Sequence, residues 1–369
     1  MNIQNFFNID IFCKVVDNFG DIGVCYRLAN NLSNKNCKVR LFVDDLLSFQ
    51  KILKIINPQK KNQNIENDIT VIQWENNFDD SITPSEVVIE GFACNLPQNF
   101  IEKFNEKTLW INLEYLSAEN WIEDCHKMQS LQPNNIRKYF FFPGFTNKTG
   151  GLNFEENLLH LNKKQAREKV FKLLNIPEKF LDKFIVFIFT YENENLIPIL
   201  KYFNETYDDV LFLIPEGRSY NYLTQNFDLA SNKNYITFKM QDQKDFDYIL
   251  RASNFNIVRG EDSIVQAIFS DAPFLWHIYK QEENAHIEKL EAFLDIYTQK
   301  LPQDLKEIIE KTFINFNLDN KDNNYYSFFK QFMIKYEQIC KHSIEFATTE
   351  SINRSLSSNL IAFIKQNLN

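Results

Sequence analysis

The sequence predicts an α/β protein made of two domains, each with a doubly wound and mostly parallel sheet. The chain has 369 residues, whereas single hydrophobic cores stop growing at about 250–300 residues. Apolar runs of strand length alternate with helical patterns in both halves, and a polar, charged stretch at 157–182 separates the two series. With 44% hydrophobic and 24% charged residues, the composition is that of a folded globular chain.

Strands and helices alternate along the first half. Residues 8–16 are rich in β-branched and apolar side chains, residues 17–23 interrupt them, and Val24, Leu28 and Leu32 follow at helical spacing. The chain therefore opens with a β-α-β unit whose crossover is right-handed. The further elements of this half are a strand at 38–45, a helix at 46–56, and strands at 69–74, 86–92 and 108–116.

The second half repeats this alternation. It contains a strand at 184–192, a helix at 197–207, a strand at 210–217, a strand-loop-helix-strand series at 255–279, and helices from 284 onward that include 325–340. We expect an N-terminal domain at 1–180 and a C-terminal domain at 181–349. A last helix at about 350–369 is expected to join the N-terminal domain.

The composition excludes several function classes. A net charge of −9 leaves no basic surface for nucleic acid, and a basic partner fits better. The six cysteines show no C-x-x-C spacing and the five histidines are scattered, so we expect no metal site and a reduced, cytoplasmic location. No apolar run approaches the roughly 18–20 residues that span a bilayer, so no membrane association is expected. Most of the 36 Phe are expected in the core, and the eight glycines direct attention to three loops.

The first loop, at residues 17–23, contains two carboxylates, Asp17 and Asp21, where a dinucleotide-binding fold would place a phosphate. Two acids at this position repel an anion. They suit a cationic acceptor group or a general base. The alternative is that both carboxylates only cap the helix.

The second loop carries Arg259, Gly260, Glu261, Asp262 and Ser263 between a strand and a helix. Ser263 and Gln266 fit a capping box, which would place backbone amides and a guanidinium at one helix N-terminus. Such an arrangement favours a phosphate, and Glu261 or Asp262 could accept hydrogen bonds from ribose hydroxyls. A purely structural, capped helix is the alternative.

Two further segments carry less chemistry. The loop at 143–151 lacks the order of a P-loop, because Lys148 precedes its paired glycines, and a surface turn is the simplest interpretation. Glu114 and Tyr115 fall near a strand end, where they could line a cleft. A nucleotide-suited second half and an acidic first half together form the layout of a GT-B glycosyltransferase.

Four segments carry a family resemblance: 10–29 (DIFCKVVDNFGDIGVCYRLA), 110–121 (WINLEYLSAENW), 138–152 (KYFFFPGFTNKTGGL) and 254–281 (NFNIVRGEDSIVQAIFSDAPFLWHIYKQ). They resemble the signature blocks of the EarP family, bacterial enzymes that attach rhamnose to an arginine of translation elongation factor P. The resemblance implies a GT-B fold with two Rossmann-like domains facing each other across a cleft. It also implies dTDP-β-L-rhamnose as donor, inversion at the anomeric carbon, and no required metal or cofactor.

The resemblance also assigns residues. It makes Asp17 and Asp21 the catalytic carboxylates. Around Met240 and Asp242 the chain departs from the aromatic and proline pattern of the family. The residues expected to hold dTDP-rhamnose are Tyr191, Gln243, Phe246, Arg259, Glu261, Asp262 and Ser263, and those expected to line the cleft are Asn18, Phe19, Gly20, Glu114 and Tyr115.

The expected mechanism is a single displacement. The pKa of a guanidinium lies about ten pH units above that of a carboxyl group, so full proton transfer in the ground state would cost on the order of 13 kcal/mol. We therefore expect Asp21 to orient the guanidinium and take its proton only as the nitrogen attacks, with Asp17 positioning the group. Two rival hypotheses remain: another inverting GT-B transferase with a different nucleotide sugar or acceptor, and a non-catalytic adaptor for a basic protein.

Overall fold

The chain divides into two compact units. The computed structural model describes residues 7–16, 19–75, 77–229, 234–281, 283, 285–318, 324–351 and 355–368. Unit 1 comprises Met1–Glu155 and Glu350–Asn369, and unit 2 comprises Glu156–Thr349.

The boundary lies after Glu155 rather than after residue 180, because the stretch expected to be a connection contains a helix of unit 2. This helix, α5 (Lys163–Leu173), begins at a capping box in which Asn162 and Gln165 bond each other's backbone amides. It packs against α8 (Gln243–Ala252). The Arg167 guanidinium donates to the carbonyl oxygen of Ala252 at 3.0 Å.

Unit 1 contains an eight-stranded sheet in the order β3-β4-β2-β1-β5-β6-β8-β7. The edge strands β3 and β7 pair antiparallel with their neighbours, and the strands between them are parallel. The strands are β1 (Asn8–Cys13), β2 (Lys38–Val43), β3 (Asn62–Ile65), β4 (Ile69–Gln73), β5 (Val87–Gly91), β6 (Leu109–Leu113), β7 (Gln129–Leu131) and β8 (Arg137–Phe141).

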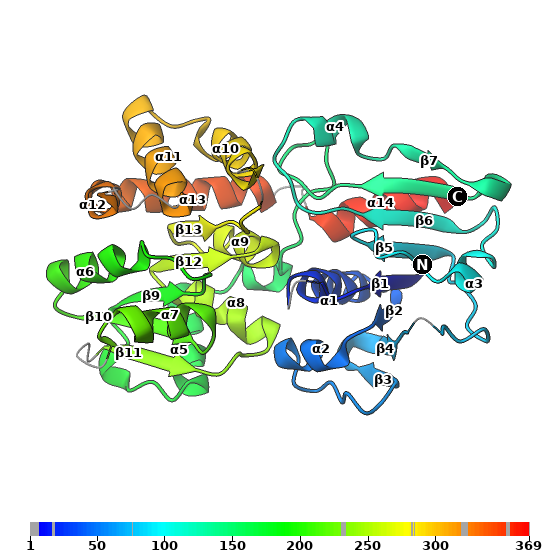
Figure 1. Cartoon of the computed structure of the whole chain (residues 1–369), viewed down its shortest axis with the longest axis horizontal. Coiled ribbons are helices and arrows are strands. Elements are labelled where there is room, and N and C mark those ends of the chain that lie inside the picture. The colour runs from blue at the N-terminus through cyan, green and yellow to red at the C-terminus, as the bar shows by residue number, and fades with distance from the viewer. Residues whose placement is uncertain are drawn as a thin grey trace. The chain divides into compact units, whose positions relative to one another are not determined.

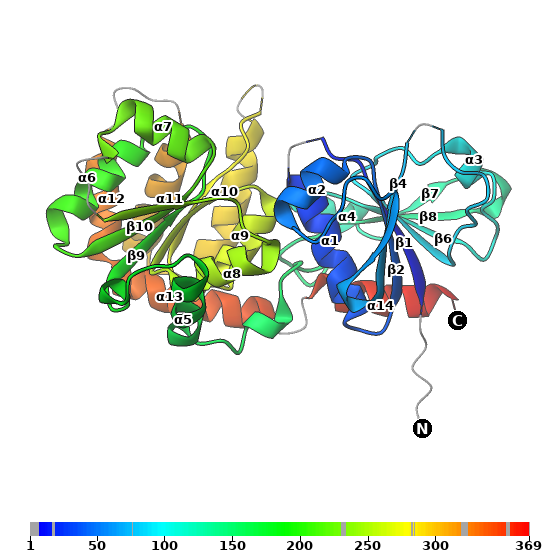
Figure 2. The same cartoon turned by 90° about the horizontal axis from the view of Figure 1, so that it is seen from below.

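Alternating side chains of these strands supply two cores, one on each face of the sheet. Ile9 and Ile11 of β1 join the core that contains α1 (Gly20–Ser33), α2 (Leu46–Ile52) and α14 (Leu356–Leu368). Phe12 joins an aromatic core on the other face, next to α3 (Gln98–Ile101). Figure 2 shows α14 running along the sheet of unit 1. The short helices of this unit are α4 (Trp121–Cys125), η1 (Glu66–Asp68) and η2 (Pro133–Asn135).

Unit 2 contains a five-stranded parallel sheet in the order β11-β10-β9-β12-β13, visible in Figure 1. Its strands are β9 (Phe184–Ile188), β10 (Val210–Pro215), β11 (Tyr235–Phe238), β12 (Phe255–Arg259) and β13 (Phe274–His277). Besides α5 and α8, its helices are η3 (Glu156–Leu158), η4 (Glu178–Phe180), α6 (Leu196–Thr206), α7 (Arg218–Asn226), α9 (Glu261–Ile268), α10 (Ala285–Thr298), α11 (Gln303–Asn317), α12 (Tyr325–Ile334) and α13 (Tyr336–Ser351). The stretch 325–340 is thus two helices rather than one.

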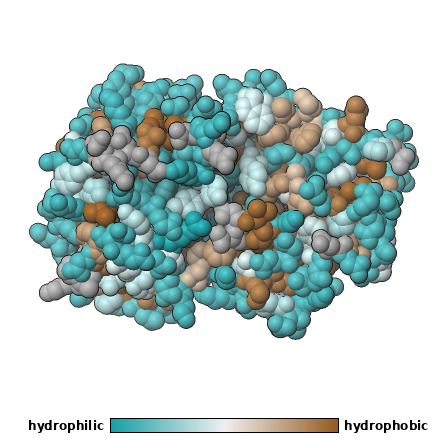
Figure 3. All heavy atoms as spheres, viewed as in Figure 1, coloured by the Kyte–Doolittle hydropathy of each residue, from teal (hydrophilic) through white to brown (hydrophobic). Residues whose placement is uncertain are grey.

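Burial agrees with the expectation for phenylalanine. The twelve largest fully buried side chains are eleven Phe and Tyr325. On the face shown in Figure 3, hydrophilic side chains dominate and hydrophobic ones form small scattered groups. Within the described part of the chain, no helix combines the length and apolarity that crossing a bilayer requires. All six cysteines are free thiols.

Each parallel sheet has a point where the strand order reverses. In unit 1 the order reverses between β1 and β5, and in unit 2 between β9 and β12. In open α/β sheets, ligands bind at the carboxyl ends of the strands beside such a point. The loops after β1, β5, β9 and β12 are therefore the positions at which the fold favours a binding site.

Candidate active site

Asp21 lies in the loop-to-helix junction after β1. It occupies the first turn of α1, where a carboxylate is favoured by the helix dipole, and its side chain is only 4% exposed. The Val16 amide donates to Oδ2 at 2.9 Å and the Tyr115 hydroxyl donates to Oδ1 at 3.3 Å. The N-cap of α1 is Phe19 without a side-chain cap bond. Asp21 therefore accepts bonds from outside the helix and does not serve as its N-cap.

The rest of this loop is placed in part. Asp17 and Asn18 lie outside the described residues. Phe19 is half-buried against the core of unit 1, and Gly20 is exposed as the first residue of α1. The structure therefore positions one of the two predicted carboxylates.

Glu114 and Tyr115 follow β6, and the structure brings Tyr115 to Asp21. The Tyr115 ring stacks on Phe92, with centroids 4.3 Å apart and planes inclined by 15°. Asn112 donates a hydrogen bond to the Glu114 carboxylate. Burial raises the pKa of Glu114, against the opposing effect of this bond.

In unit 2, Arg259 and Tyr191 come together at the carboxyl edge beside the reversal point. Arg259 is the last residue of β12, and Tyr191 follows the paired strand β9. The guanidinium carbon of Arg259 lies 4.6 Å from the Tyr191 ring centroid and 4.9 Å from that of Phe189. These distances are those of cation–π contacts, so two rings hold a positive charge at this edge.

The loop after β12 also meets the start of α8. The Gln243 amide donates to Oδ2 of Asp262 at 3.2 Å, which joins two predicted nucleotide-binding residues. Glu261 forms an ion pair with Lys289 at 2.8 Å. Phe246 is buried and packs edge-on against Phe187 and Phe189 beneath the edge, so the structure places its ring in the core.

The predicted capping box at Ser263 and Gln266 is wrong. Helix α9 begins at Glu261 and its N-cap is Gly260, which adopts φ +73° and ψ 169°. A positive φ of this kind is accessible to glycine and starts the helix earlier than the pattern indicates. Ser263 is therefore a buried residue of the first turn.

Sequence reasoning missed further residues around Tyr191. The guanidinium carbon of Arg218 lies 5.5 Å from the Tyr191 ring centroid, and Arg218 pairs with Glu192 at 3.8 Å. His277 and Tyr279 contact the same ring edge-on. Gly217 precedes α7 with φ +144°, as Gly260 precedes α9. That repeated strand-glycine-helix pattern is the signal that could have found Arg218.

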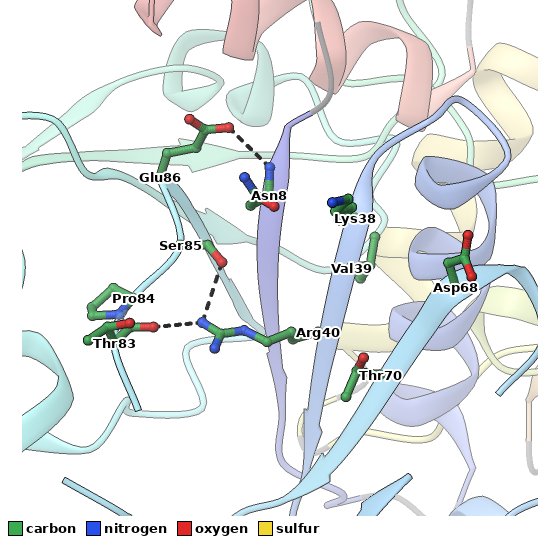
Figure 4. Close-up of a pocket in the computed structure, with 10 residues that line it drawn as sticks. All are labelled: Asn8, Lys38, Val39, Arg40, Asp68, Thr70, Thr83, Pro84, Ser85 and Glu86. Carbon is green, nitrogen blue, oxygen red and sulfur yellow. Dashed lines mark hydrogen bonds between the residues drawn. The ribbon is translucent and has the colours of Figure 1, made fainter. Parts of the chain in front are cut away.

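A pocket of about 740 Å³ lies at the opposite edge of the unit 1 sheet, at the amino ends of β1 and β2 (Figure 4). Arg40 in this pocket forms two 2.7 Å bonds to the buried carboxylate of Asp10 and donates to the Thr83 carbonyl oxygen at 2.7 Å. None of the predicted site residues lines this pocket. The Arg40–Asp10 pair joins β2 to β1.

The chain has two Rossmann-like units, with an acidic junction at the reversal point of one sheet and a cationic edge at that of the other. These features define the class of protein: the chain is a glycosyltransferase of GT-B fold. Medicago truncatula UGT71G1, solved in complex with UDP-glucose, matches with a TM-score of 0.56 at 11% identity over all of both chains. The family model described as Elongation-Factor P (EF-P) rhamnosyltransferase EarP matches residues 9–365. The chain belongs to this EarP family.

Individual relatives agree with this assignment. A protein-arginine rhamnosyltransferase from Pseudomonas aeruginosa is 37% identical over 84% of this chain and 86% of its own length. One from Neisseria meningitidis is 35% identical over 77% of each chain. A solved structure described as the basis for EarP-mediated arginine glycosylation of EF-P covers 98% of this chain and 99% of its own, with a TM-score of 0.63 and 22% identity.

Proposed function

We propose that this enzyme transfers L-rhamnose from dTDP-β-L-rhamnose to an arginine side chain of translation elongation factor P, with inversion at the anomeric carbon. One observation carries the proposal: a buried carboxylate lies at the reversal point of one sheet, and a guanidinium held by aromatic rings lies at that of the other. The acceptor and the sugar follow from the relatives, which are protein-arginine rhamnosyltransferases and include the EarP that glycosylates EF-P.

Asp21 is proposed to receive the arginine. Its two oxygens are fixed by bonds from Val16 and Tyr115, so the carboxylate is oriented before the substrate arrives. A charge-assisted bond then aligns the guanidinium for attack. The proton moves to Asp21 late, as the nitrogen bonds to the oxocarbenium-like carbon, because early transfer would cost on the order of 13 kcal/mol. We propose that Asp17 of the same loop helps to orient the group.

The departing dTDP is proposed to bind unit 2. As the sugar–oxygen bond breaks, negative charge grows on the diphosphate, and Arg259 and the first turn of α9 are suited to meet it. Gln243, Glu261 and Asp262 offer amide and carboxylate groups for the nucleoside. Tyr191, Phe246 and Ser263 complete the expected set. With these groups meeting the charge, the proposed transfer requires no metal or other cofactor. The six free thiols support a cytoplasmic location.

Intact-mass spectrometry tests the proposal. Purified enzyme, elongation factor P and dTDP-rhamnose should give an elongation factor P heavier by one deoxyhexose, and an anomeric NMR signal of inverted configuration. Asp21→Asn should lower the rate at least a hundredfold, since general-base groups contribute about 10²–10⁴-fold. An unmodified acceptor with the folded wild-type enzyme, or full activity in Asp21→Asn, would contradict it. Binding of elongation factor P without a mass increase would favour the adaptor hypothesis.

Calorimetry with dTDP tests the donor site in the same preparation. Arg259→Ala should weaken dTDP binding at least tenfold, because a charged contact with the diphosphate is lost. Lys341→Ala removes a cation that is 78% exposed on α13 and serves as the matched control. Preferential stabilisation by UDP rather than dTDP in a thermal-shift panel would favour the rival with another sugar nucleotide.

A further inference from the structure

We propose that Tyr115 is a positioning and specificity-determining residue of the acceptor site: its hydroxyl orients Asp21, and its ring provides a stacking surface for the planar guanidinium of the substrate. This inference rests on the function proposed above. It starts from the juxtaposition of Asp21, Tyr115 and Phe92, which follow the strands β1, β6 and β5.

The first step is the contact with Asp21. The Tyr115 hydroxyl donates to Oδ1 at 3.3 Å, and the opposite oxygen accepts from the Val16 amide at 2.9 Å. Two donors on different oxygens restrict rotation of the carboxylate about its last bond. Tyr115 thereby helps to fix the plane of the Asp21 carboxylate.

The second step is the support beneath the ring. Phe92 stacks on Tyr115 from a loop in which Phe92, Ala93 and Asn95 have φ values of +54°, +50° and +60°. Residues other than glycine rarely adopt this conformation, and it persists where the surroundings impose it. Here the Ala93 amide donates to Asn112 at 3.1 Å and the Asn95 amide to Glu90 at 3.0 Å.

The groups that hold this loop are themselves fixed. Asn112 and Glu90 are almost fully buried in β6 and β5. Glu90 pairs with Lys138 at 2.8 Å and accepts a bond from the Trp110 ring nitrogen at 3.0 Å. The buried network therefore fixes the conformation of the loop, and the loop fixes the position of Phe92. The Phe92 ring in turn fixes the plane of the Tyr115 ring.

The third step is the exposure of the ring. Tyr115 is 45% exposed although Phe92 covers one face. Because Phe92 covers one face, a planar ligand would stack on the other face of the ring, whose hydroxyl contacts Asp21. A planar guanidinium stacks on such a surface while its N–H groups reach the carboxylate, whereas a lysine ammonium offers no plane to stack. The arrangement thus favours arginine over lysine.

Steady-state kinetics with elongation factor P and dTDP-rhamnose separate the two roles. Tyr115→Phe keeps the ring and removes the hydroxyl, so kcat should fall about tenfold while KM for elongation factor P stays within twofold of wild type. Tyr115→Leu removes the ring as well, so KM should rise about fivefold or more. A KM that stays at the wild-type value in Tyr115→Phe but rises in Tyr115→Leu would show that the ring binds the acceptor. A merely structural role of Tyr115 would not separate the two variants in this way.

Acceptor binding provides the specificity readout. Calorimetry with elongation factor P and with its variant carrying lysine at the modified position gives an affinity ratio for each enzyme. The ratio of the affinity for elongation factor P to the affinity for its lysine variant should fall about fivefold in Tyr115→Leu. The matched control is Tyr326→Phe in unit 2, which deletes another tyrosine hydroxyl that donates to a carboxylate, Glu205, at 2.5 Å. It should leave kcat and KM unchanged, and all variants should keep wild-type affinity for dTDP.

Three outcomes overturn the inference while the proposed function stands. The first is an unchanged kcat in Tyr115→Phe, and the second is an unchanged acceptor KM and affinity ratio in Tyr115→Leu, each with wild-type transfer intact. The third is loss of dTDP binding in the folded Tyr115 variants. If wild-type enzyme does not modify elongation factor P, the proposed function itself fails, which the same assay shows first.

Discussion

His126 of unit 1 is a neutral base held by the backbone. The Phe142 amide donates to its Nδ1 at 3.1 Å, so Nδ1 is an acceptor and the ring proton is on Nε2. Nε2 is buried and meets no hydrogen-bond partner among the described residues. Burial lowers the pKa of His126 to about 4. Protonation of Nδ1 would place two N–H groups against each other and break the contact.

Acid should therefore destabilise unit 1 through His126. The folded pKa is below the unfolded value of about 6.5, so the unfolded chain binds more protons and stability is lost as the pH falls from about 6.5 to 4. Between pH 7 and pH 5, the free energy of unfolding measured with urea should fall by about 1–2 kcal/mol more in the wild type than in His126→Gln. The glutamine can accept the same hydrogen bond without titrating. An equal loss in both proteins would contradict this.

Among the site residues, those marked by local sequence were predictable and those set by tertiary contacts were not. Asp21 and Arg259 stand beside glycines at strand ends, which is a local signal. The role of Phe92 depends on a left-handed backbone without glycine, imposed by Asn112 and Glu90 from neighbouring strands. Burial of Phe246 likewise follows from packing against Phe187 and Phe189.

At the level of elements, Gly260 sets the start of α9. A Cβ added there would meet no atom within 4 Å, so its requirement is conformational and not steric. Gly260→Ala should cost about 1–3 kcal/mol or shift the loop to relieve the strain. Calorimetry should show dTDP binding roughly tenfold weaker, since a shift moves Arg259 and Asp262. Unchanged affinity together with unchanged stability would refute this role.

Most of the parallel strands were predictable because their apolar runs are long and bounded by turns. The parallel strands β8 and β11 were not predicted. The division of residues 325–340 into α12 and α13 could not be predicted, because Lys335 continues the helical pattern of both neighbouring helices. The capping-box prediction at Ser263 failed for a related reason. Its residues fit the template, but the helix begins after the positive φ of Gly260, so its N-cap lies three residues before Ser263.

At the scale of the molecule, α14 completes the core of unit 1 although it follows unit 2 in the chain. Leu360 is fully buried there. Leu360→Ala should destabilise unit 1 by about 2–5 kcal/mol. Hydrogen exchange should then speed up in β1 and β6 but not in β9 and β12. Leu294→Ala, at a buried site of α10, is the matched control and should affect unit 2 instead. Faster exchange in both units with Leu360→Ala would contradict this division.

The division at Glu155 could not be predicted from composition. The charged stretch at 157–182 has the polarity of a linker, yet Ala166, Val170 and Phe171 form the buried face of α5. That face is recognisable only once α8 is present to cover it.

The return of the chain to unit 1 has a consequence for synthesis on the ribosome. Residues 156–349 are translated before the segment that fills the core of unit 1. Unit 2 can therefore fold before α14 has been translated, and until then the part of the unit 1 core that Leu356, Leu360 and Ile364 fill is incomplete.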